Sequence, residues 1–490
     1  MKILKDFHKE SRKSSLKSNY IFNLTNTITQ LLFPLITFSY VARIMGPEII
    51  GKVNFYISII AYVSMFVGLG IPLYAVREIS RIRSDRQKIN QMTAEIFTLH
   101  LGLALIGYLV IFIICLTVPK VYEDIPLFLL LSLSVLFTAI GCEWFYQGIE
   151  DFKYITVRAI IVRLICVVLL FVLVHSKEDV MLYACYCVVG TVGNNVFNFV
   201  RLNRYVSRDF IDFHNFYPLR HLKSVSKVFL LLTISTIYIS LNSIMLGFFA
   251  DEKSVGYYTT GVKLFIILFS IINALTTIMI PHASKIIAER KEDEFRQLGQ
   301  RLYRFTIGIT LPMAVGLVFI SPYAVILLAG EDFIPSVIVA RIVAPLLVVV
   351  GLSSLFGMQI LYPLGHINIM IRAVILAGIV DIVINFLFIG TMAHVAAAIA
   401  YLLAEIVATC SEYIMGRKHI PIRLADRALY NYFVGSVALA VVLYFVSQFN
   451  LNNIMMVIAM SLCGFIVYAL YLSFRKDMLW EMVLALVKKR

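Results

Sequence analysis

Charged side chains are scarce in this 490-residue sequence, which contains 15% charged and 60% hydrophobic residues. A soluble protein of this size would contain roughly 25% charged residues. The mean hydropathy is correspondingly high, at +0.87. This balance excludes an ordinary soluble domain and indicates a chain that lies in a membrane.

Cysteine and catalytic motifs are also scarce. The seven cysteines are an odd number and lie in or beside apolar segments, which argues against a disulfide framework and against a metal site. The sequence lacks the G-x-x-x-x-G-K-[ST] loop of an ATPase and the H-E-x-x-H pair of a metalloprotease. We therefore expect a protein that is not an enzyme and has no cofactor and no bound metal.

Long apolar runs take the place of such motifs. Each has about 20 residues, enough to cross a hydrocarbon layer of ~30 Å. Fourteen runs occupy residues 20–43, 52–74, 92–118, 125–147, 156–175, 179–200, 225–249, 257–280, 303–321, 337–361, 371–389, 394–415, 428–448 and 452–474. The basic, polar start has no cleavage site of a signal peptide, so we expect the first run to direct insertion. The predicted fold class is an all-α polytopic membrane protein with about 14 transmembrane helices.

Lysine and arginine are distributed unevenly among the connections. With the N-terminus in the cytoplasm, 36 of the 43 basic residues fall on the cytoplasmic side. The seven on the outer side are Arg43, Lys52, Lys120, Lys177, Lys253, Lys263 and Arg341. This bias follows the positive-inside rule and predicts that both termini are cytoplasmic. The formal charge of +14 therefore needs no nucleic-acid partner to explain it.

Aromatic and basic residues are mixed in the longest connection, residues 201–223. Such a mixture is typical of a segment at the membrane interface, in contact with lipids. Trp144 and Tyr146 are interpreted as residues of an interfacial aromatic belt, with stacking on a sugar as the alternative.

Two parts of the sequence show the same order of features. Gly51 opens the second run and Gly256 opens the eighth, and each run continues to a proline near its end, Pro72 or Pro281. Six runs separate the two glycines, so both halves have the same orientation, as in a parallel repeat. Chance recurrence of glycine and proline is the alternative.

Several stretches resemble one family of membrane proteins. FPLITFSYVARIMGPEIIGKVNF at 33–55 resembles the first-span signature of bacterial polysaccharide flippases, or O-antigen translocases. They belong to the multidrug/oligosaccharidyl-lipid/polysaccharide exporter superfamily, with multidrug extruders and lipid II flippases. Further matches are GLGIPLYAVREI (68–79), EWFYQGIEDFKYI (143–155), IMLGFFADEKSVGYYTTGVKL (244–264), LAGEDFIPS (328–336) and AHVAAAIAYLLAE (393–405).

The resemblance implies two pseudo-symmetric six-helix lobes, 1–205 and 206–425, followed by two more helices and a tail at 426–490. It implies a monomer in the bacterial inner membrane that moves an undecaprenyl-diphosphate-linked oligosaccharide to the periplasmic leaflet, with coupling to H⁺ or Na⁺ left open. A polysaccharide polymerase and a chain-length regulator are the implied partners. The alternatives are a multidrug or lipid II exporter and, from another class, a membrane-embedded polymerase or transferase, which the short outer loops argue against.

Basic residues in or beside the spans are candidates for a cationic cavity that binds the diphosphate, because a guanidinium can hold phosphate oxygens in a bidentate fork. These candidates are Arg43, Arg163, Lys263, Arg341 and Arg372. For Arg43 the alternative is a structural pairing with Glu48. Arg158 is interpreted as an interfacial residue.

Polar and acidic residues within the spans complete the candidate site, since such residues are costly in a membrane. The polar cavity lining is predicted at Asn23, Asn26, Gln30 and Asn242, although some relatives carry an acid where this chain has Asn242. Asp381 and Glu405 are the candidates for ion coupling, with pairing to an arginine such as Arg372 as the alternative. Asp381 shares a helix face with Asn385, and Glu405 with Glu412. Pro34, Pro72 and Pro281 are predicted hinges.

Overall fold

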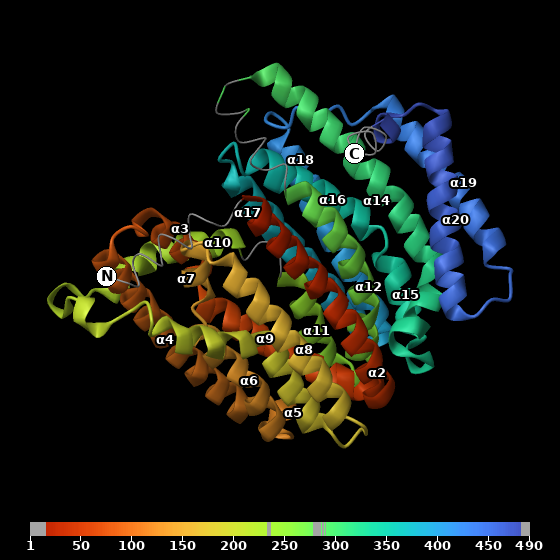
Figure 1. The fold of residues 1–490 in the computed structure, drawn as a ribbon. Coiled ribbons are helices and arrows are strands. Elements are labelled where there is room, and N and C mark those ends of the chain that lie inside the picture. The colour runs from red at the N-terminus through yellow and green to blue at the C-terminus, as the bar shows by residue number, and fades with distance from the viewer. Residues whose placement is uncertain (1–15, 233–236, 278–285, 287–288, 290, 482–490) are drawn as a thin grey trace. The chain divides into compact units, whose positions relative to one another are not determined.

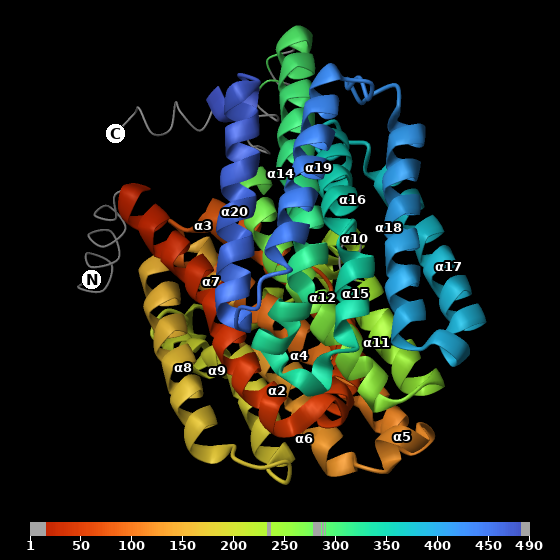
Figure 2. The same ribbon diagram turned by 90° about the vertical axis from the view of Figure 1, so that its right-hand side faces the viewer.

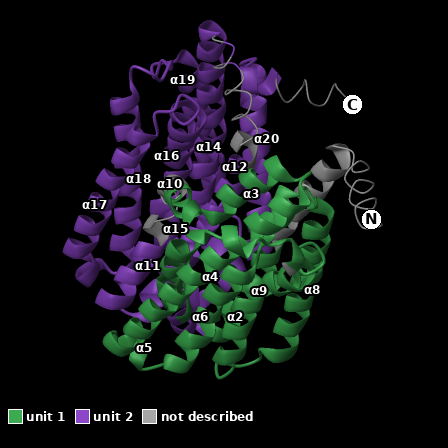
Figure 3. Ribbon diagram, turned by 90° about the vertical axis from the view of Figure 1, so that its left-hand side faces the viewer, with its two compact units in different colours: residues 1–45, 53–236 green, residues 46–52, 237–490 purple. Residues whose placement is uncertain are grey.

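The computed structural model describes residues 16–232, 237–277, 286, 289 and 291–481 (Figure 1). The chain divides into two compact units (Figure 3). Unit 1 comprises residues 1–45 and 53–236, and unit 2 comprises residues 46–52 and 237–490. All elements of the described residues are helical, which confirms the predicted all-α class.

Eleven helices of the described residues are long and apolar enough to cross a membrane, or twelve if one bent pair counts as a span. One of the eleven extends from Phe33 to Ile82 and so contains the last part of the first predicted span and the whole of the second. The polytopic architecture is therefore confirmed, whereas the count of fourteen stays a prediction, as do the lobe boundaries.

Unit 1 is built from long helices with short connections. Its elements are most of α2 (Leu16–Gly68), α3 (Ile71–Ile82), α4 (Arg86–Thr117), α5 (Pro119–Tyr122), α6 (Ile125–Ile140), α7 (Glu143–Gly148), α8 (Phe152–Leu173), α9 (Val180–Leu202), η1 (Arg208–Phe210), η2 (Phe213–Asn215), η3 (Pro218–His221) and α10 (Leu222–Leu232).

Aspartates fix the starts of three of these helices. Asp85, Asp124 and Asp151 are the N-caps of α4, α6 and α8, and each side chain accepts a hydrogen bond from a first-turn amide. Such a cap satisfies one of the backbone donors that a helix start leaves without an intrahelical partner. The caps explain why these apolar runs begin as helices where they do.

Two of the predicted hinge prolines lie in unit 1. Pro34 lies inside α2, and the helix continues through it; the residue with non-helical backbone angles is Gly46, with φ 70° and ψ 176°. Pro72 stands in the first turn of α3, after Gly70 in the left-handed conformation. Pro281 lies outside the described residues. A hinge role for each proline stays a prediction.

Unit 2 contains the remaining elements. They are α11 (Ile237–Phe249), α12 (Glu252–Thr277), α14 (Glu292–Ala329), η5 (Glu331–Phe333), α15 (Ser336–Val343), α16 (Leu346–Ser353), the π-helical η6 (Ser354–Leu361), α17 (Ile367–Met392), α18 (His394–Gly416), α19 (Arg427–Val446) and α20 (Asn453–Phe474).

Helices α17 and α18 lie side by side along their length (Figure 2). Ala373 and Ala377 of α17 and Ala397 and Ala404 of α18 are all completely buried. Small side chains let two helix backbones approach closely, which is how helices associate where lipid removes the hydrophobic driving force. This close pair positions the acidic residues of the candidate site.

The two glycines of the predicted repeat meet within unit 2, because residues 46–52 pack with the start of α12. A Cβ atom on Gly51 would lie 1.6 Å from the Glu252 carbonyl oxygen, and one on Gly256 would lie 2.1 Å from the Pro47 carbonyl oxygen. The contact is therefore reciprocal and backbone to backbone, and no larger residue fits. Lys253 pairs with Glu48 beside it, at 3.6 Å.

Candidate functional site

A closed group of three polar side chains lies inside unit 2. Asn242 of α11 donates from Nδ2 to Asp381 Oδ1 at 3.1 Å, and Asn385 Nδ2 donates to Asn242 Oδ1 at 2.7 Å. Asn385 Nδ2 also donates to the Asp381 backbone carbonyl at 2.9 Å. All three side chains are completely buried. We call these three residues the Asp381 cluster.

The helix geometry explains why these residues meet. Asp381 and Asn385 are one turn apart, so they share a face of α17, as their spacing predicts. The other faces of this stretch are apolar and exposed, with Ile382, Val383 and Phe386 among them. The polar pair therefore points away from lipid, toward α11, which packs on α17.

The Asp381 cluster keeps unused oxygen atoms. Asp381 Oδ2 and Asn385 Oδ1 are buried and accept no hydrogen bond within the part of the chain that the structure describes. The phenol of Tyr258, completely buried on α12, lies within electrostatic reach of Asp381. Carboxylate, amide and hydroxyl oxygens are the ligands that hard cations prefer. The arrangement can accept a proton or a small monovalent cation.

The second predicted coupling residue, Glu405, lies on α18 and is half-buried. Its carboxyl interacts electrostatically with that of Asp381, the acidic residue of α17. No ion pair joins either carboxyl to a basic residue among the described residues, and Arg372 is exposed. The alternative in which Arg372 neutralises Asp381 is therefore wrong. No group of three or more His, Cys, Asp or Glu residues in the described part could hold a metal ion.

The predicted basic residues are distributed between the two units. In unit 1, Arg43 is exposed and donates from Nη1 to the Ser39 carbonyl at 2.8 Å, and Arg163 is half-buried. In unit 2, Lys263 is half-buried, and Arg341 is exposed and donates from Nε to the Val318 carbonyl at 3.3 Å. A shared cationic cavity stays a prediction. Glu48, the predicted structural partner of Arg43, pairs with Lys253 instead.

Three residues of the predicted polar lining, Asn23, Asn26 and Gln30, belong to α2, but their side chains lie outside the described residues. The fourth, Asn242, is a member of the Asp381 cluster. The sequence placed it among the cavity-lining residues, and only the packing of α11 against α17 shows its two partners.

Sequence reasoning missed a buried arginine site in unit 1. Arg158 is 6% exposed. Its guanidinium donates to Glu143 Oε2 at 3.0 Å, to Asn194 Oδ1 at 3.2 Å and to Asn198 Oδ1. The interpretation of Arg158 as interfacial is therefore wrong, because Asn194 and Asn198 on the neighbouring α9 replace water around its charge.

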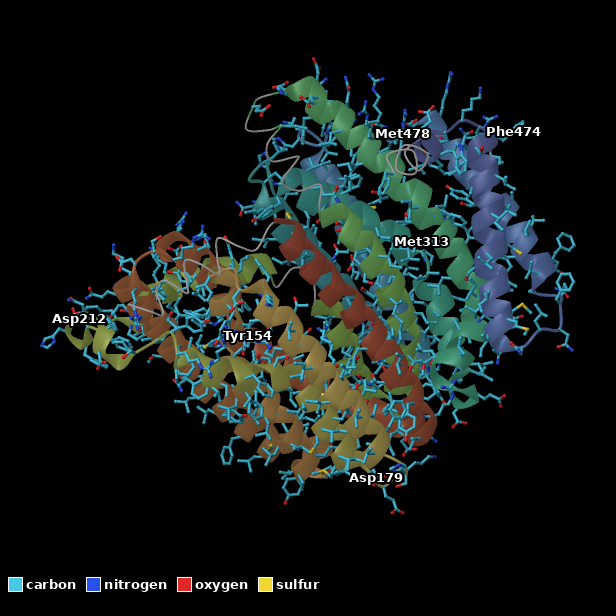
Figure 4. All side chains as sticks on the ribbon, in the orientation of Figure 1. Tyr154, Asp179, Asp212, Met313, Phe474 and Met478 are labelled. Atoms are coloured by element: carbon cyan, nitrogen blue, oxygen red, sulfur yellow. The ribbon has the colours of Figure 1, made fainter. Side chains whose placement is uncertain are left out.

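The aromatic residues of the same region are buried as well. Trp144 is 3% exposed and Tyr146 is completely buried, with its hydroxyl donating to the Asn198 carbonyl at 2.7 Å. They belong to the core of unit 1, so the interpretation as an interfacial belt is wrong. Arg201 stacks on Tyr154 at 3.7 Å from the ring centroid; Figure 4 labels Tyr154. The density of aromatic and acidic residues in 143–155 was the available signal for this core.

A buried polar network holds the connection between α9 and α10. Glu95 of α4 accepts from His221 Nε2 at 2.8 Å, and Tyr74 donates to His221 Nδ1 at 2.8 Å. Burial lowers the pKa of His221, and Glu95 opposes only part of that effect, so the imidazole is neutral at neutral pH. Around this anchor the side chains of Phe213, Tyr217 and Leu219 are exposed, as expected for a segment that faces lipid headgroups.

The relatives of this chain carry names that refer to O-antigen or capsular polysaccharide. Two relatives are each named "Putative O-antigen transporter". The one from Escherichia coli (strain K12) is 23% identical over 81% of this chain and 96% of its own length. The one from Shigella dysenteriae is 26% identical over 72% of this chain and 88% of its own length. The capsular polysaccharide biosynthesis protein CapF of Staphylococcus aureus is 22% identical over 81% of this chain and 97% of its own length.

Solved structures show the same fold. The lipid II flippase MurJ in an inward closed conformation matches 94% of this chain and 100% of its own, with a TM-score of 0.77 and 15% identity. An inward-facing multidrug resistance MATE family transporter of the MOP superfamily matches 82% of this chain and 98% of its own, with a TM-score of 0.64 and 15% identity.

The family described as "Polysaccharide biosynthesis protein" matches residues 16–287, more than half of the sequence. This match covers the stretches on which the resemblance rested from 33–55 to 244–264. The chain belongs to the polysaccharide biosynthesis protein family.

Proposed function

We propose that this protein is a flippase that carries an undecaprenyl-diphosphate-linked oligosaccharide from the cytoplasmic to the periplasmic leaflet by alternating access. Family membership and two relatives named as O-antigen transporters support a polysaccharide precursor as the cargo. The shared fold with a lipid II flippase supports a lipid-linked substrate. The protein would act without enzyme activity and as a monomer, beside a polysaccharide polymerase and a chain-length regulator.

The Asp381 cluster is the observation that carries the proposal. An uncompensated carboxyl inside a membrane span is costly and is a functional candidate by default. Binding of H⁺ or Na⁺ at Asp381 would change the charge buried in unit 2, and so would shift the balance between conformations that bury it differently. This property supports a transporter over a polymerase or transferase, whose chemistry requires acid and base groups that reach the reacting atoms of the substrate.

The basic residues Arg43, Arg163 and Lys263 would bind the diphosphate. Replacing all three by glutamine should abolish surface glycan while the protein stays in the membrane. Arg43→Lys alone should also reduce export, because lysine lacks the bidentate fork of arginine. Normal export by the triple variant would exclude this binding role.

The direct test is transport by the purified protein in proteoliposomes. The expected result is movement of the lipid-linked oligosaccharide between leaflets, faster under an imposed H⁺ or Na⁺ gradient. Lipid II and a cationic drug, offered separately, test the two alternative cargoes of the same fold. Movement of only one of these, or chain growth without movement, would overturn the proposal in favour of an exporter of that cargo or of a polymerase.

A further inference from the structure

A second buried carboxyl in unit 2 lies apart from the Asp381 cluster. Glu412 is 3% exposed and belongs to the last part of α18, two turns beyond Glu405 and about 10 Å further along the helix axis. Its Oε2 accepts from Ser353 Oγ at 2.9 Å. A Cβ on Gly357 would lie 2.8 Å from Glu412 Oε1. The carboxyl therefore occupies the space that a glycine leaves open.

The element opposite Glu412 is the π-helical η6. The hydrogen bond from Tyr362 to the Gly357 carbonyl spans five residues, at 2.8 Å, as in a π-helix. A π-helical turn inside an α-helix is uncommon and occurs mostly at functional sites. It also widens the helix locally, and here the side chain of Glu412 fills that region.

In the part of the chain that the structure describes, no basic residue forms an ion pair with Glu412. Elements α16 and η6 contain no ionisable residue, and among the described residues no ion pair reaches this carboxyl. Glu405, the acid within electrostatic reach, is of the same charge. The described ionisable side chains on α18 and on the elements packed against it are Glu252, Lys253, Tyr257, Tyr258, Lys263, Arg341, Arg372, Asp381, His394, Tyr401, Glu405, Cys410 and Tyr413.

An ionised carboxylate with one hydroxyl donor and a buried apolar surrounding is expensive, whereas the neutral acid is not. The neutral form carries one O–H donor and keeps acceptor capacity for Ser353. Among the described residues no group of three or more His, Cys, Asp or Glu side chains could hold a metal ion, and the hydrogen bond at Glu412 joins it to a single neutral hydroxyl. The chemistry of the site therefore fits a proton.

A stacked pair of histidines lies just beyond the C-terminal ends of η6 and α18. The rings of His366, after η6, and His419, after α18, lie 3.7 Å apart between centroids. Behind them Leu361 packs on Gly416, where a Cβ would lie 3.0 Å from the leucine side chain. His419 is exposed and His366 is half-buried, so water reaches the pair, and Glu412 lies seven residues before His419, about 10 Å along the helix direction.

We propose that Glu412 is a proton-binding site, separate from the Asp381 cluster, that exchanges its proton with water at the end of unit 2 covered by the His366–His419 stack. A proton delivered from this side converts the carboxylate to the acid, and loss of the proton leaves a buried anion against the π-helical turn. Any part that this exchange plays in transport rests on the proposed function, but proton binding itself does not.

Infrared spectroscopy of the purified full-length protein in bilayers tests the assignment without a transport assay. The expected result is a protonated-carboxyl C=O component, seen as the difference between the unchanged protein and Glu412→Gln, that weakens as the medium is made alkaline. Glu331→Gln, an exposed acid, is the matched control and should keep the band. Ser353→Ala keeps the carboxyl but removes its hydrogen bond, so the band should remain and move to higher wavenumber.

The stack is tested by transfer of the protein to heavy water. His419→Gln should speed the deuteration of the Glu412 band severalfold, while His214→Gln, on an exposed turn of unit 1, should leave its rate unchanged. A protonated-carboxyl band of unchanged intensity in Glu412→Gln, or a Glu412 component that does not respond to Ser353→Ala, would overturn the proton site. Unchanged deuteration in His419→Gln would overturn the route. If the unchanged protein shows the Glu412 band but does not move the lipid-linked oligosaccharide, only the proposed function is refuted.

Discussion

Asp381 lies where α17 faces α11, and its described hydrogen-bond partner is the amide of Asn242, which is neutral. Binding of a cation would change the net charge at this carboxyl, because no guanidinium among the described residues forms an ion pair with it. Glu405 adds a like charge within reach on the adjacent α18. The two carboxyls therefore repel each other when both carry a charge.

Replacing Asp381 by asparagine should remove the response of transport to an imposed H⁺ or Na⁺ gradient. The amide keeps the size and the acceptor oxygen for Asn242 but cannot bind a proton or attract a cation. Transport in proteoliposomes with and without the gradient measures the effect. Asp332→Asn, an exposed acid of η5, should behave as the unchanged protein. A gradient response that survives in Asp381→Asn would show that this carboxyl is structural.

The sequence placed Asp381 and Asn385 on one face correctly, since a spacing of four depends only on helix geometry. It could not supply their third partner, because the packing of α11 on α17 joins residues far apart in the chain. Arg158 was misjudged for the same reason. Its neutral partners lie on α9, and a position near a span end does not distinguish a solvated arginine from one solvated by asparagines.

At the scale of elements, Asp426 fixes the start of α19. Its Oδ2 accepts from Arg304 Nε at 2.6 Å, and its Oδ1 accepts from the Ala428 amide at 3.0 Å. Burial alone would raise the pKa of Asp426, but hydrogen bonds from Arg304, Ala428 and Gln300 hold it below the ordinary value of 3.8. Ionised Asp426 therefore stabilises the fold above about pH 3.8, and this contribution is lost as the pH falls through the lowered value.

Asp426→Asn should lower the free energy of unfolding by about 1 kcal/mol at neutral pH, since asparagine caps as well but forms no ion pair with the partly exposed Arg304. The difference from the unchanged protein should vanish in acid. Thermal unfolding in detergent at both pH values measures it. The reverse exchange at a cap without an ion pair, Asn452→Asp, should have little effect. A difference that persists in acid would contradict the assignment to charge.

Gly51→Ala should separate residues 46–52 from α12, because the added methyl group would meet the Glu252 backbone, which has no rotamer to change. Overpacking of this kind costs about 1–3 kcal/mol. Disulfide formation between Glu48→Cys and Lys253→Cys, in a variant without the native cysteines, reports the contact, and its yield should fall. Gly68→Ala is the matched control in the same helix, since nothing lies within 4 Å of its Cβ. Equal yields in both would mean that the contact is not close in the membrane.

For the whole molecule, the charge distribution predicts which ends of the helices face the cytoplasm. A cysteine replacing Lys253 should react with a membrane-impermeant reagent in intact cells, and one replacing Arg423 should react only after permeabilisation. Both positions are exposed, so burial cannot account for a difference. Labelling in the opposite order would reverse the predicted orientation of both termini.

The all-helical, polytopic character was predictable because bilayer thickness fixes the length of a span and leaves its mark on composition. The number of spans was less certain. Residues 337–361 form one predicted apolar run, but the structure divides it at Pro345 with a bend of 42° and then changes it to a π-helix. Residues 20–74 contain two runs, yet the helix between them is interrupted only at Gly46. Hydropathy separates the two runs around Gly46, but it does not record the bend at Pro345 or the π-helix.

The placement of residues 46–52 in unit 2, between two stretches of unit 1, has a consequence for synthesis on the ribosome. Gly51 emerges about 200 residues before Gly256, the residue it contacts. At ~5–20 residues per second, the segment waits about 10–40 s for its partner. During that interval the first pair of spans is already inserted, while the backbone surface around Gly51 is uncovered. Membrane insertion of this chain is therefore expected to pass through a long-lived intermediate in which the turn around Gly51 is available to a chaperone or an insertase.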